Sequence, residues 1–263
     1  MRMAMLKDRF ALLVVSCDKY ADLWPPFFRL FFHFWPDCPF TIYLLSNNER
    51  LSLPGVNSIL VGNDVSWSDN LLKAGALLPH DYLLLFIDDL FLIDYVQTEK
   101  VEEVCHWLLD AKANYVRLNP SVPPDGPGND LVGSVSKGTL YRASTVLSVW
   151  KREVLLSLLK PGENAWQFEG RGSLRSDRYD AFYSTRESLF PVLNGVIKGK
   201  WDRTALRRLS ALGVSLDLRQ RGCMTVIESS LLFLQRLRFR VLHLLPAAQR
   251  RKIKHLFQGA TRG

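Results

Sequence analysis

The chain has 263 residues, of which 48% are hydrophobic, so it can bury a substantial core and is not disordered. Its four cysteines lack the CxxC spacing of zinc sites, which argues against a zinc site or a disulfide framework and fits a reducing cytosol. The formal net charge of +8 lies entirely beyond Glu228, where eight Lys or Arg residues and no acidic residue occur. No apolar run reaches the roughly 18 residues that a membrane-spanning helix needs.

Apolar strand patterns alternate with helical patterns over roughly the first 120 residues, which predicts a mostly parallel α/β sheet with right-handed crossovers. The predicted strands are 10–16, 40–45, 58–61, 82–87 and 115–118. The predicted helices are 25–35, 69–78 with Ser68 as N-cap, 98–113 with Thr98 as N-cap, and 151–159. A loop rich in Pro and Gly is predicted over 119–133, and its length favours a functional role.

The run from Tyr82 to Ile87 is the centre of the prediction, because six apolar or aromatic residues end abruptly in Asp88 and Asp89. Such a run is typical of a strand buried on both faces. Two aspartates cannot lie unpaired in a core, so they must lie at the sheet edge, where open α/β folds bind ligands. Carboxylates together with substrate phosphates hold Mg²⁺ or Mn²⁺, so this strand end predicts a metal–diphosphate site. An acidic cap of the following turn is the alternative.

Polar residues also follow two other predicted strands, with Asp18 after the first and Asn47 after the second. The ends of parallel strands converge on one crevice, so these groups can line a nucleobase or ribose there. Ordinary turn chemistry is the alternative for each of them. Neither GxGxxG nor GxxxxGK[ST] follows the first strand, which excludes a standard dinucleotide or P-loop site.

The order of these elements, with the step from Ile87 to Leu90, resembles the nucleotide-binding half of GT-A-fold glycosyltransferases and their DxD motif in its adjacent-aspartate form. The second half resembles bacterial polysaccharide and lipopolysaccharide sugar transferases in the stretches 150–155, 161–169 and 194–201. The resemblance covers roughly 10–222. It implies a GT-A-like, Rossmann-like fold and transfer of a sugar from a nucleotide sugar, UDP- or GDP-linked above all, to an acceptor hydroxyl.

By this resemblance, Asp89 would bind a divalent cation, Mn²⁺ or Mg²⁺, and Asp88 would bind the cation or the ribose. Asp18 and Asn47 would line the base and ribose, and Asp69 and Asn70 fall where related enzymes contact the nucleotide. Two lysines, Lys198 and Lys200, would close over the diphosphate as a lid; a solvated basic turn is the alternative.

An inverting transferase also needs a carboxylate base near the acceptor hydroxyl. Glu163 is the first candidate, because Pro161 and Gly162 place it in a turn, and Glu169 is the second. Trp166 could stack on a sugar. The alternative is that Glu163 stabilises the first turn of a helix and that Trp166 belongs to the core.

Residues 229–263 form a separate basic tail in which apolar residues recur at helical spacing among Lys and Arg. This pattern predicts an interfacial helix pair on anionic lipid. Nucleic-acid binding, or packing against a partner, is the alternative; the former is disfavoured because few aromatic side chains lie among the charges.

The sequence thus predicts a GT-A-like domain over 1–228, with a nucleotide-sugar half at about 8–119 and an acceptor half at about 120–228, followed by a membrane-associating tail. The expected function is metal-dependent, inverting glycosyl transfer to a glycan or lipid-linked acceptor during assembly of a bacterial surface polysaccharide. The expected place is the cytoplasmic face of the inner membrane. The alternatives are a sugar-nucleotide nucleotidyltransferase and an inactive membrane-associated binding protein.

Overall fold

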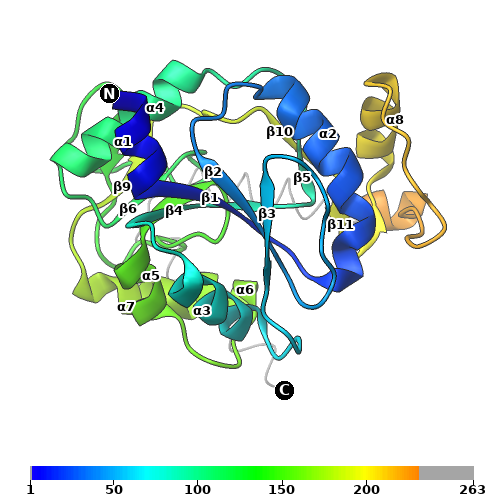
Figure 1. Cartoon of the computed structure of the whole chain (residues 1–263). Coiled ribbons are helices and arrows are strands. Elements are labelled where there is room, and N and C mark those ends of the chain that lie inside the picture. The colour runs from blue at the N-terminus through cyan, green and yellow to red at the C-terminus, as the bar shows by residue number, and fades with distance from the viewer. Residues whose placement is uncertain (1, 231–263) are drawn as a thin grey trace.

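The computed structural model describes residues 2–230, and its centre is an eight-stranded sheet with the strand order β3-β2-β1-β4-β8-β6-β9-β7 (Figure 1). The first four strands run parallel to one another, whereas β8 lies antiparallel between β4 and β6, and β7 is antiparallel to β9. The strands are β1 (Phe10–Val15), β2 (Thr41–Ser46), β3 (Val56–Leu60), β4 (Tyr82–Ile87), β6 (Tyr115–Arg117), β7 (Val132–Ser134), β8 (Ser148–Lys151) and β9 (Phe182–Thr185).

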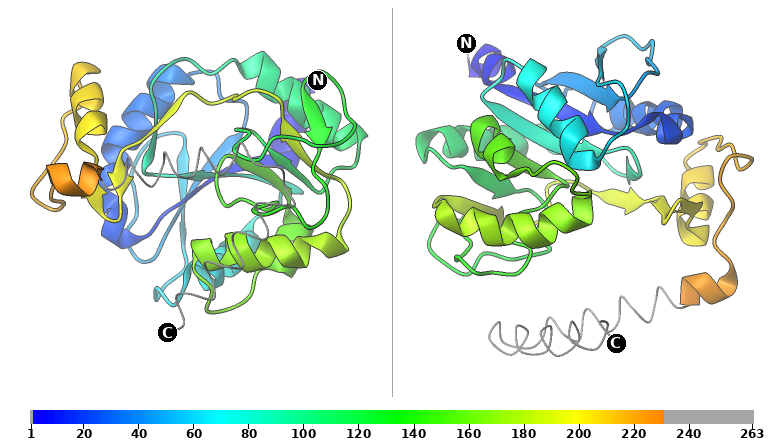
Figure 2. Two further views of the ribbon diagram at one scale, coloured as in Figure 1. Left: turned by 180° about the vertical axis from the view of Figure 1, so that it is seen from behind. Right: turned by 90° about the horizontal axis from the view of Figure 1, so that it is seen from below.

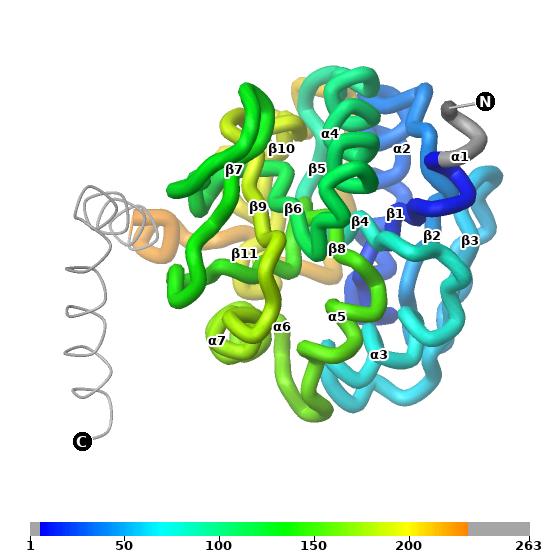
Figure 3. The backbone as a smooth tube through the Cα atoms, turned by 90° about the vertical axis from the view of Figure 1, so that its left-hand side faces the viewer, coloured from blue at the N-terminus to red at the C-terminus, as the bar shows by residue number. Residues whose placement is uncertain are grey.

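Helices cover both faces of this sheet, as the view along the sheet in Figure 3 shows. One face carries α1 (Arg2–Arg9), α2 (Trp24–Phe34) and α4 (Thr98–Asp110), and α8 (Arg203–Ala211) lies at the α2 end of the molecule (Figure 2). The other face carries α3 (Trp67–Leu77), α5 (Arg152–Leu158), α6 (Ala165–Gln167) and α7 (Ser173–Arg175). The predicted α/β class, a mostly parallel sheet flanked by helices, is confirmed.

The alternation of buried side chains explains why β1 is apolar throughout. Phe10, Leu12 and Val14 pack on the α2 side, and Ala11 and Leu13 pack on the α3 side. A strand covered on both faces by helices needs no polar residue, so a continuous apolar run is the expected sequence.

Two helix starts differ from the predictions. The N-cap of α3 is Ser66, whose hydroxyl accepts a hydrogen bond from the Asp69 amide at 3.1 Å, and not Ser68, which lies buried inside the first turn. Thr98 does not cap α4, because its hydroxyl accepts a hydrogen bond from the Trp35 indole at 3.0 Å. Both helices otherwise lie within a few residues of their predicted bounds.

Several short strands were not indicated by the sequence. Strands β5 (Leu90–Leu92) and β10 (Val192–Asn194) form one antiparallel pair, and β11 (Val196–Ile197) and β12 (Lys200–Trp201) form another. The loop predicted over 119–133 is confirmed up to residue 131, and its last two residues belong instead to β7. Among residues 2–230, no helix is long and apolar enough to cross a membrane. The predicted tail, apart from its first two residues, lies outside the described residues.

Candidate active site

The site lies where the strand order reverses, between the carboxyl ends of β1 and β4. Ser16 directly follows β1, and its hydroxyl donates a hydrogen bond to the Asp88 carboxylate after β4. The Trp24 indole donates to the same Ser16 oxygen at 2.7 Å. Open α/β sheets bind ligands in the crevice at such a reversal. The bond between Ser16 and Asp88 therefore spans the position at which this fold binds a ligand.

Both aspartates have pKa values above the ordinary value of an aspartate. Burial, with the nearby Asp89 charge, raises the pKa of Asp88 to about 8, although the Ser16 hydrogen bond opposes this shift. Burial also raises the pKa of Asp89 to about 6, and Arg221 opposes that shift. One Asp89 carboxylate oxygen, Oδ1, is buried and has no hydrogen-bond partner among the residues that the structure describes.

These features fit a divalent cation, because a positive charge would offset the burial of two carboxylates and occupy the unpaired oxygen. The described residues contain no cluster of three or more His, Cys, Asp or Glu side chains that could hold a metal. A cation at Asp88 and Asp89 would therefore take its remaining ligands from water and substrate phosphates, as Mg²⁺ usually does.

Arg221 is part of this site, and the sequence reasoning missed it. Its guanidinium forms a two-pronged ion pair with Asp22, with both contacts at 2.7 Å, and donates to the Lys19 carbonyl at 2.6 Å. It also lies 4.1 Å from the centre of the Tyr20 ring. This buried pair fastens the chain near residue 221 to the 3₁₀ turn Asp18–Leu23 that follows β1. No local signal could have linked residues 199 positions apart.

The structure brings Asp18 and Asn47 together, but both side chains form hydrogen bonds with backbone groups of the protein. The Asp18 carboxylate accepts backbone N–H bonds from Asn47, Asn48 and Glu49 at 2.9–3.2 Å. Burial would raise the pKa of Asp18, but these donors outweigh it and lower that pKa. The Asn47 amide donates to the Gly62 carbonyl at 3.0 Å. Both residues thus hold the ends of β1, β2 and β3 together beside the crevice.

Asp69 and Asn70 lie in the first turn of α3 and also have internal partners. The Asp69 carboxylate accepts from Ser66 at 2.5 Å and from the Gly162 amide at 2.8 Å, and these bonds, that from Ser66 most of all, lower the pKa of Asp69. The Asn70 amide donates to Asp64 at 2.8 Å. The Asp69 contact fastens α3 to the turn that precedes Glu163.

The two glutamates differ sharply in their surroundings. Both oxygens of Glu163 are held by the Arg175 guanidinium at 2.9 and 2.5 Å, and the residue is 5% exposed. The Oε1 atom of Glu169 accepts from the Ser144 hydroxyl and from the Thr145 amide and hydroxyl at 2.9–3.1 Å, and within residues 2–230 no hydrogen bond is formed by its other oxygen. The ion pair with Arg175 occupies both oxygens of Glu163, so that neither oxygen is left for an acceptor hydroxyl. The geometry therefore favours Glu169, the second candidate, over Glu163, the first.

Lys198 and Lys200 belong to the hairpin of β11 and β12, Lys198 at its turn and Lys200 at the start of β12. The Gly195 amide donates to the Asp89 carbonyl at 2.8 Å, which anchors this hairpin to the site. The Lys200 ammonium pairs with Glu228 at 2.6 Å, and Lys198 is exposed at a turn position with φ of 51°. Within residues 2–230, the contacts of both lysines therefore do not reach Asp88 or Asp89, and their role as a lid stays a prediction.

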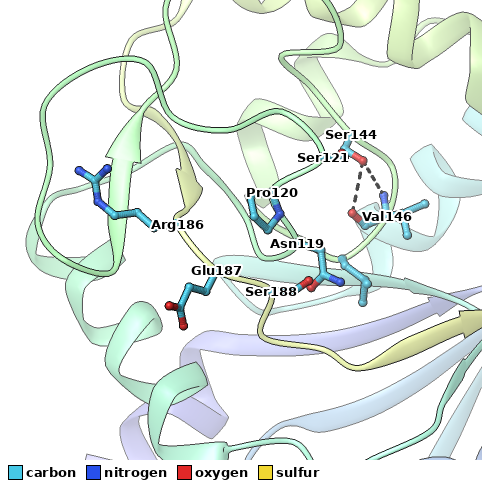
Figure 4. Close-up of a pocket in the computed structure, with 9 residues that line it drawn as sticks. Asn119, Pro120, Ser121, Ser144, Val146, Arg186, Glu187 and Ser188 are labelled. Atoms are coloured by element: carbon cyan, nitrogen blue, oxygen red, sulfur yellow. Dashed lines mark hydrogen bonds between the residues drawn. The ribbon is translucent and has the colours of Figure 1, made fainter. Parts of the chain in front are cut away.

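An open pocket of about 450 Å³ lies at the same carboxyl edge, beyond the ends of β6 and β9. Figure 4 shows Asn119, Ser121, Ser144 and Ser188 among its lining residues. In the sheet, β8 lies between β6 and β4, so the pocket lies further along the same edge than the two aspartates. Glu169 adjoins it through its bond to Ser144. This volume suits a small ligand.

No protein-family model and no curated protein matches the sequence. Among solved structures, a UDP-glucose pyrophosphorylase complexed with UDP-glucose has a TM-score of 0.52 at 7% identity, over 78% of this chain and 98% of that one. The UTP-bound UGPase from Acinetobacter baumannii has a TM-score of 0.52 at 10% identity, over 87% and 98%. TarS 1–349 from S. aureus in complex with UDP has a TM-score of 0.47 at 9% identity, over 81% and 67%.

The fold is GT-A-like. The two pyrophosphorylase structures share the mostly parallel central sheet flanked by helices, and at this identity the likeness concerns the fold alone. The chain spans 59% of another TarS 1–349 structure and 36% of the longer TarS structure.

Proposed function

We propose that this protein is a glycosyltransferase that moves a sugar from a nucleotide-sugar donor to a hydroxyl of a glycan or lipid-linked acceptor. The observation that carries the proposal is the pair Asp88 and Asp89 at the strand-order reversal, with raised pKa values and an unpaired buried oxygen. A bound cation would offset the burial of these two carboxylates, and a diphosphate would supply further oxygen ligands to that cation. The cellular setting we propose is surface-polysaccharide assembly at the cytoplasmic face of a bacterial membrane, with the basic tail on anionic lipid.

In this proposal Asp89 and Asp88 hold Mg²⁺ or Mn²⁺, which when bound supplies positive charge against the leaving nucleoside diphosphate. The turn after β1 and the turn after β2 form the walls for the base and ribose, with Asp18 and Asn47 fixing their shape. Asp69 and Asn70 fix the start of α3 beside them. Arg221 keeps the first of these turns in place from the opposite end of the chain.

The acceptor enters the pocket near Ser144 and Ser188. Glu169 takes the proton from the acceptor hydroxyl through its free oxygen, the hydroxyl oxygen bonds to the anomeric carbon, and the bond to the diphosphate breaks. This single displacement inverts the configuration at that carbon. Glu163 instead holds Arg175 and so fixes the helical segment that carries Glu169. Lys198 and Lys200 border the diphosphate.

A nucleotidyltransferase is the second candidate, and the likeness to two pyrophosphorylase structures favours it. Nucleotidyltransferases that make sugar nucleotides have a glycine-rich basic loop after their first strand. Here the residues after β1 are Ser16, Cys17, Asp18, Lys19 and Tyr20, without glycine, and they lead into a 3₁₀ turn. A non-catalytic binding protein would bind a nucleotide sugar without turnover.

Calorimetry with UDP, GDP, ADP and dTDP, with and without Mn²⁺ or Mg²⁺, tests the proposal on the wild type and Asp89→Asn. We expect one nucleotide to bind with metal and binding to weaken at least tenfold in Asp89→Asn. The matched control is Asp81→Asn, which changes a carboxylate at the opposite end of the same strand. Absence of binding by every nucleotide to the folded protein would refute the proposal. Pyrophosphate release from a nucleoside triphosphate and a sugar phosphate would favour the second candidate.

A further inference from the structure

One face of the segment 165–178 is both apolar and basic. Helix α6, the π-helical turn Phe168–Gly172, α7 and the 3₁₀ turn Ser176–Arg178 follow one another without a break. Phe168, Gly172, Ser173 and Ser176 point inward and are buried. Outward lie four exposed residues, here called the 166–178 face: Trp166 at 80% exposure, Arg171, Leu174 at 68%, and Arg178.

The π-helical turn aligns these residues. In an ordinary α-helix, Trp166 and Leu174 would be about 80° apart around the axis, since each residue turns the chain by about 100°. A π-helical turn contains more residues than an α-helical turn, so each residue rotates the chain by a smaller angle. Five π-helical residues between Trp166 and Leu174 therefore reduce the angle between the two side chains and bring them to the same side of the helix axis. The exposed positions, spaced by five, three and four residues, agree with a single outward face.

The charge of this face is positive. Arg171 lies 3.8 Å from Glu163, but Glu163 already binds Arg175 with both oxygens, so a net positive charge remains. Arg178 donates to the Ser157 carbonyl at 2.7 Å and has no acidic partner among residues 2–230. The acidic residues of the same segment face other groups: Glu169 binds Thr145 and Asp177 accepts from the Gly138 amide.

Trp166 is 80% exposed, so the alternative that it belongs to the core is wrong, and its stacking on a sugar stays a prediction. Trp166 does not line the pocket. A large indole exposed to 80% costs free energy in water unless it meets a further surface. Leu174 cannot hydrogen-bond to a sugar, so a purely glycan-binding face leaves it unexplained.

We propose that the 166–178 face rests on an anionic lipid surface, with Trp166 and Leu174 at the headgroup boundary and Arg171 and Arg178 on lipid phosphates. Alternating apolar and basic residues on one helical face, with an aromatic residue, is the composition of interfacial helices. This contact is separate from the tail and does not depend on the proposed catalytic activity.

Co-sedimentation of the full chain with vesicles of phosphatidylcholine, with and without one quarter phosphatidylglycerol, tests the inference. Each basic residue near an anionic surface contributes roughly 1 kcal/mol, which is about a fivefold change in partitioning. We expect Arg171→Gln/Arg178→Gln and Trp166→Ala/Leu174→Ala each to bind anionic vesicles at least fivefold more weakly. The matched control is Arg207→Gln/Arg208→Gln on α8, which removes the same charge from an exposed site elsewhere.

A second measurement separates this face from the tail. An environment-sensitive fluorophore on Leu174→Cys, with Cys223→Ser to remove the exposed native thiol, should shift to shorter wavelength on anionic vesicles. The same label on Arg207→Cys should not shift. Absence of a shift at residue 174 would overturn the inference, whatever the tail does. A shift with a soluble glycan but not with vesicles would overturn it in favour of glycan binding.

Discussion

Replacing Asp88 by Asn should abolish a pH-dependent loss of stability. Burial raises the pKa of Asp88 to about 8, whereas an unfolded aspartate titrates near about 3.9. Between these values the native state binds more protons than the unfolded state, so its stability is full at low pH and falls as the pH rises through 8. Asn is uncharged at every pH and cannot lose stability in this way.

The magnitude follows from single-site linkage. For native and unfolded pKa values of about 8 and about 3.9, raising the pH from about 5.5 to about 8.5 costs about 3 kcal/mol of unfolding free energy. Urea unfolding in EDTA at both pH values measures this difference for the wild type, Asp88→Asn and the control Asp81→Asn. The wild type and the control should lose about 3 kcal/mol more than Asp88→Asn.

A divalent cation should restore, at high pH, the unfolding free energy that is lost when Asp88 ionises. Because a cation binds the ionised pair in the native state only, millimolar Mn²⁺ should stabilise the wild type at about pH 8.5 and much less at about pH 5.5. Asp88→Asn should gain less at either pH. Parallel pH curves for the wild type and Asp88→Asn would refute the assignment of a buried, proton-binding carboxyl to this strand end.

Three further changes give simple outcomes. Glu163→Gln leaves Arg175 without its counter-charge and should cost about 3 kcal/mol of unfolding free energy, with activity lost only in proportion to unfolding; a folded but inactive variant would restore Glu163 as the base. Gly195→Ala would place a methyl group 2.4 Å from the Phe91 ring and should lower the melting temperature by several degrees, roughly 1–3 kcal/mol; an unchanged melting temperature would contradict this packing. Arg221→Gln removes a positive charge that opposes the raised pKa values of the strand-end aspartates, so the pH midpoint of metal binding, followed by calorimetry, should move upward; a downward shift would contradict it.

The first half of the chain could be predicted well because long apolar runs determine its strands. Strands such as Tyr82–Ile87 are buried on both faces, and their sequence shows where they end. The position of Asp88 and Asp89 at the sheet edge followed from the cost of burying charge. For Asp18, the structure agrees more closely with the turn-chemistry alternative, since backbone amides occupy its carboxylate.

Contacts between distant residues were beyond the sequence reasoning. The pairing of Arg221 with Asp22 joins segments 199 positions apart, whose relative position depends on the whole fold. The short strand β8 has no alternating pattern, because Ser148 and Lys151 flank two apolar residues. Its antiparallel direction depends on the loop before it, and the sequence gives no direct sign of that direction.

The place of β8 in the sheet has a consequence for folding during synthesis. β4 is complete about 60 residues before β8, its partner on one side, has been made. Until then the strand Tyr82–Ile87 exposes an apolar edge on which another chain could pair. We therefore expect the half-sheet of a nascent chain to be prone to aggregation while β8 is still missing. A chain truncated before Ser148 should bind a chaperone more strongly than one truncated after α5.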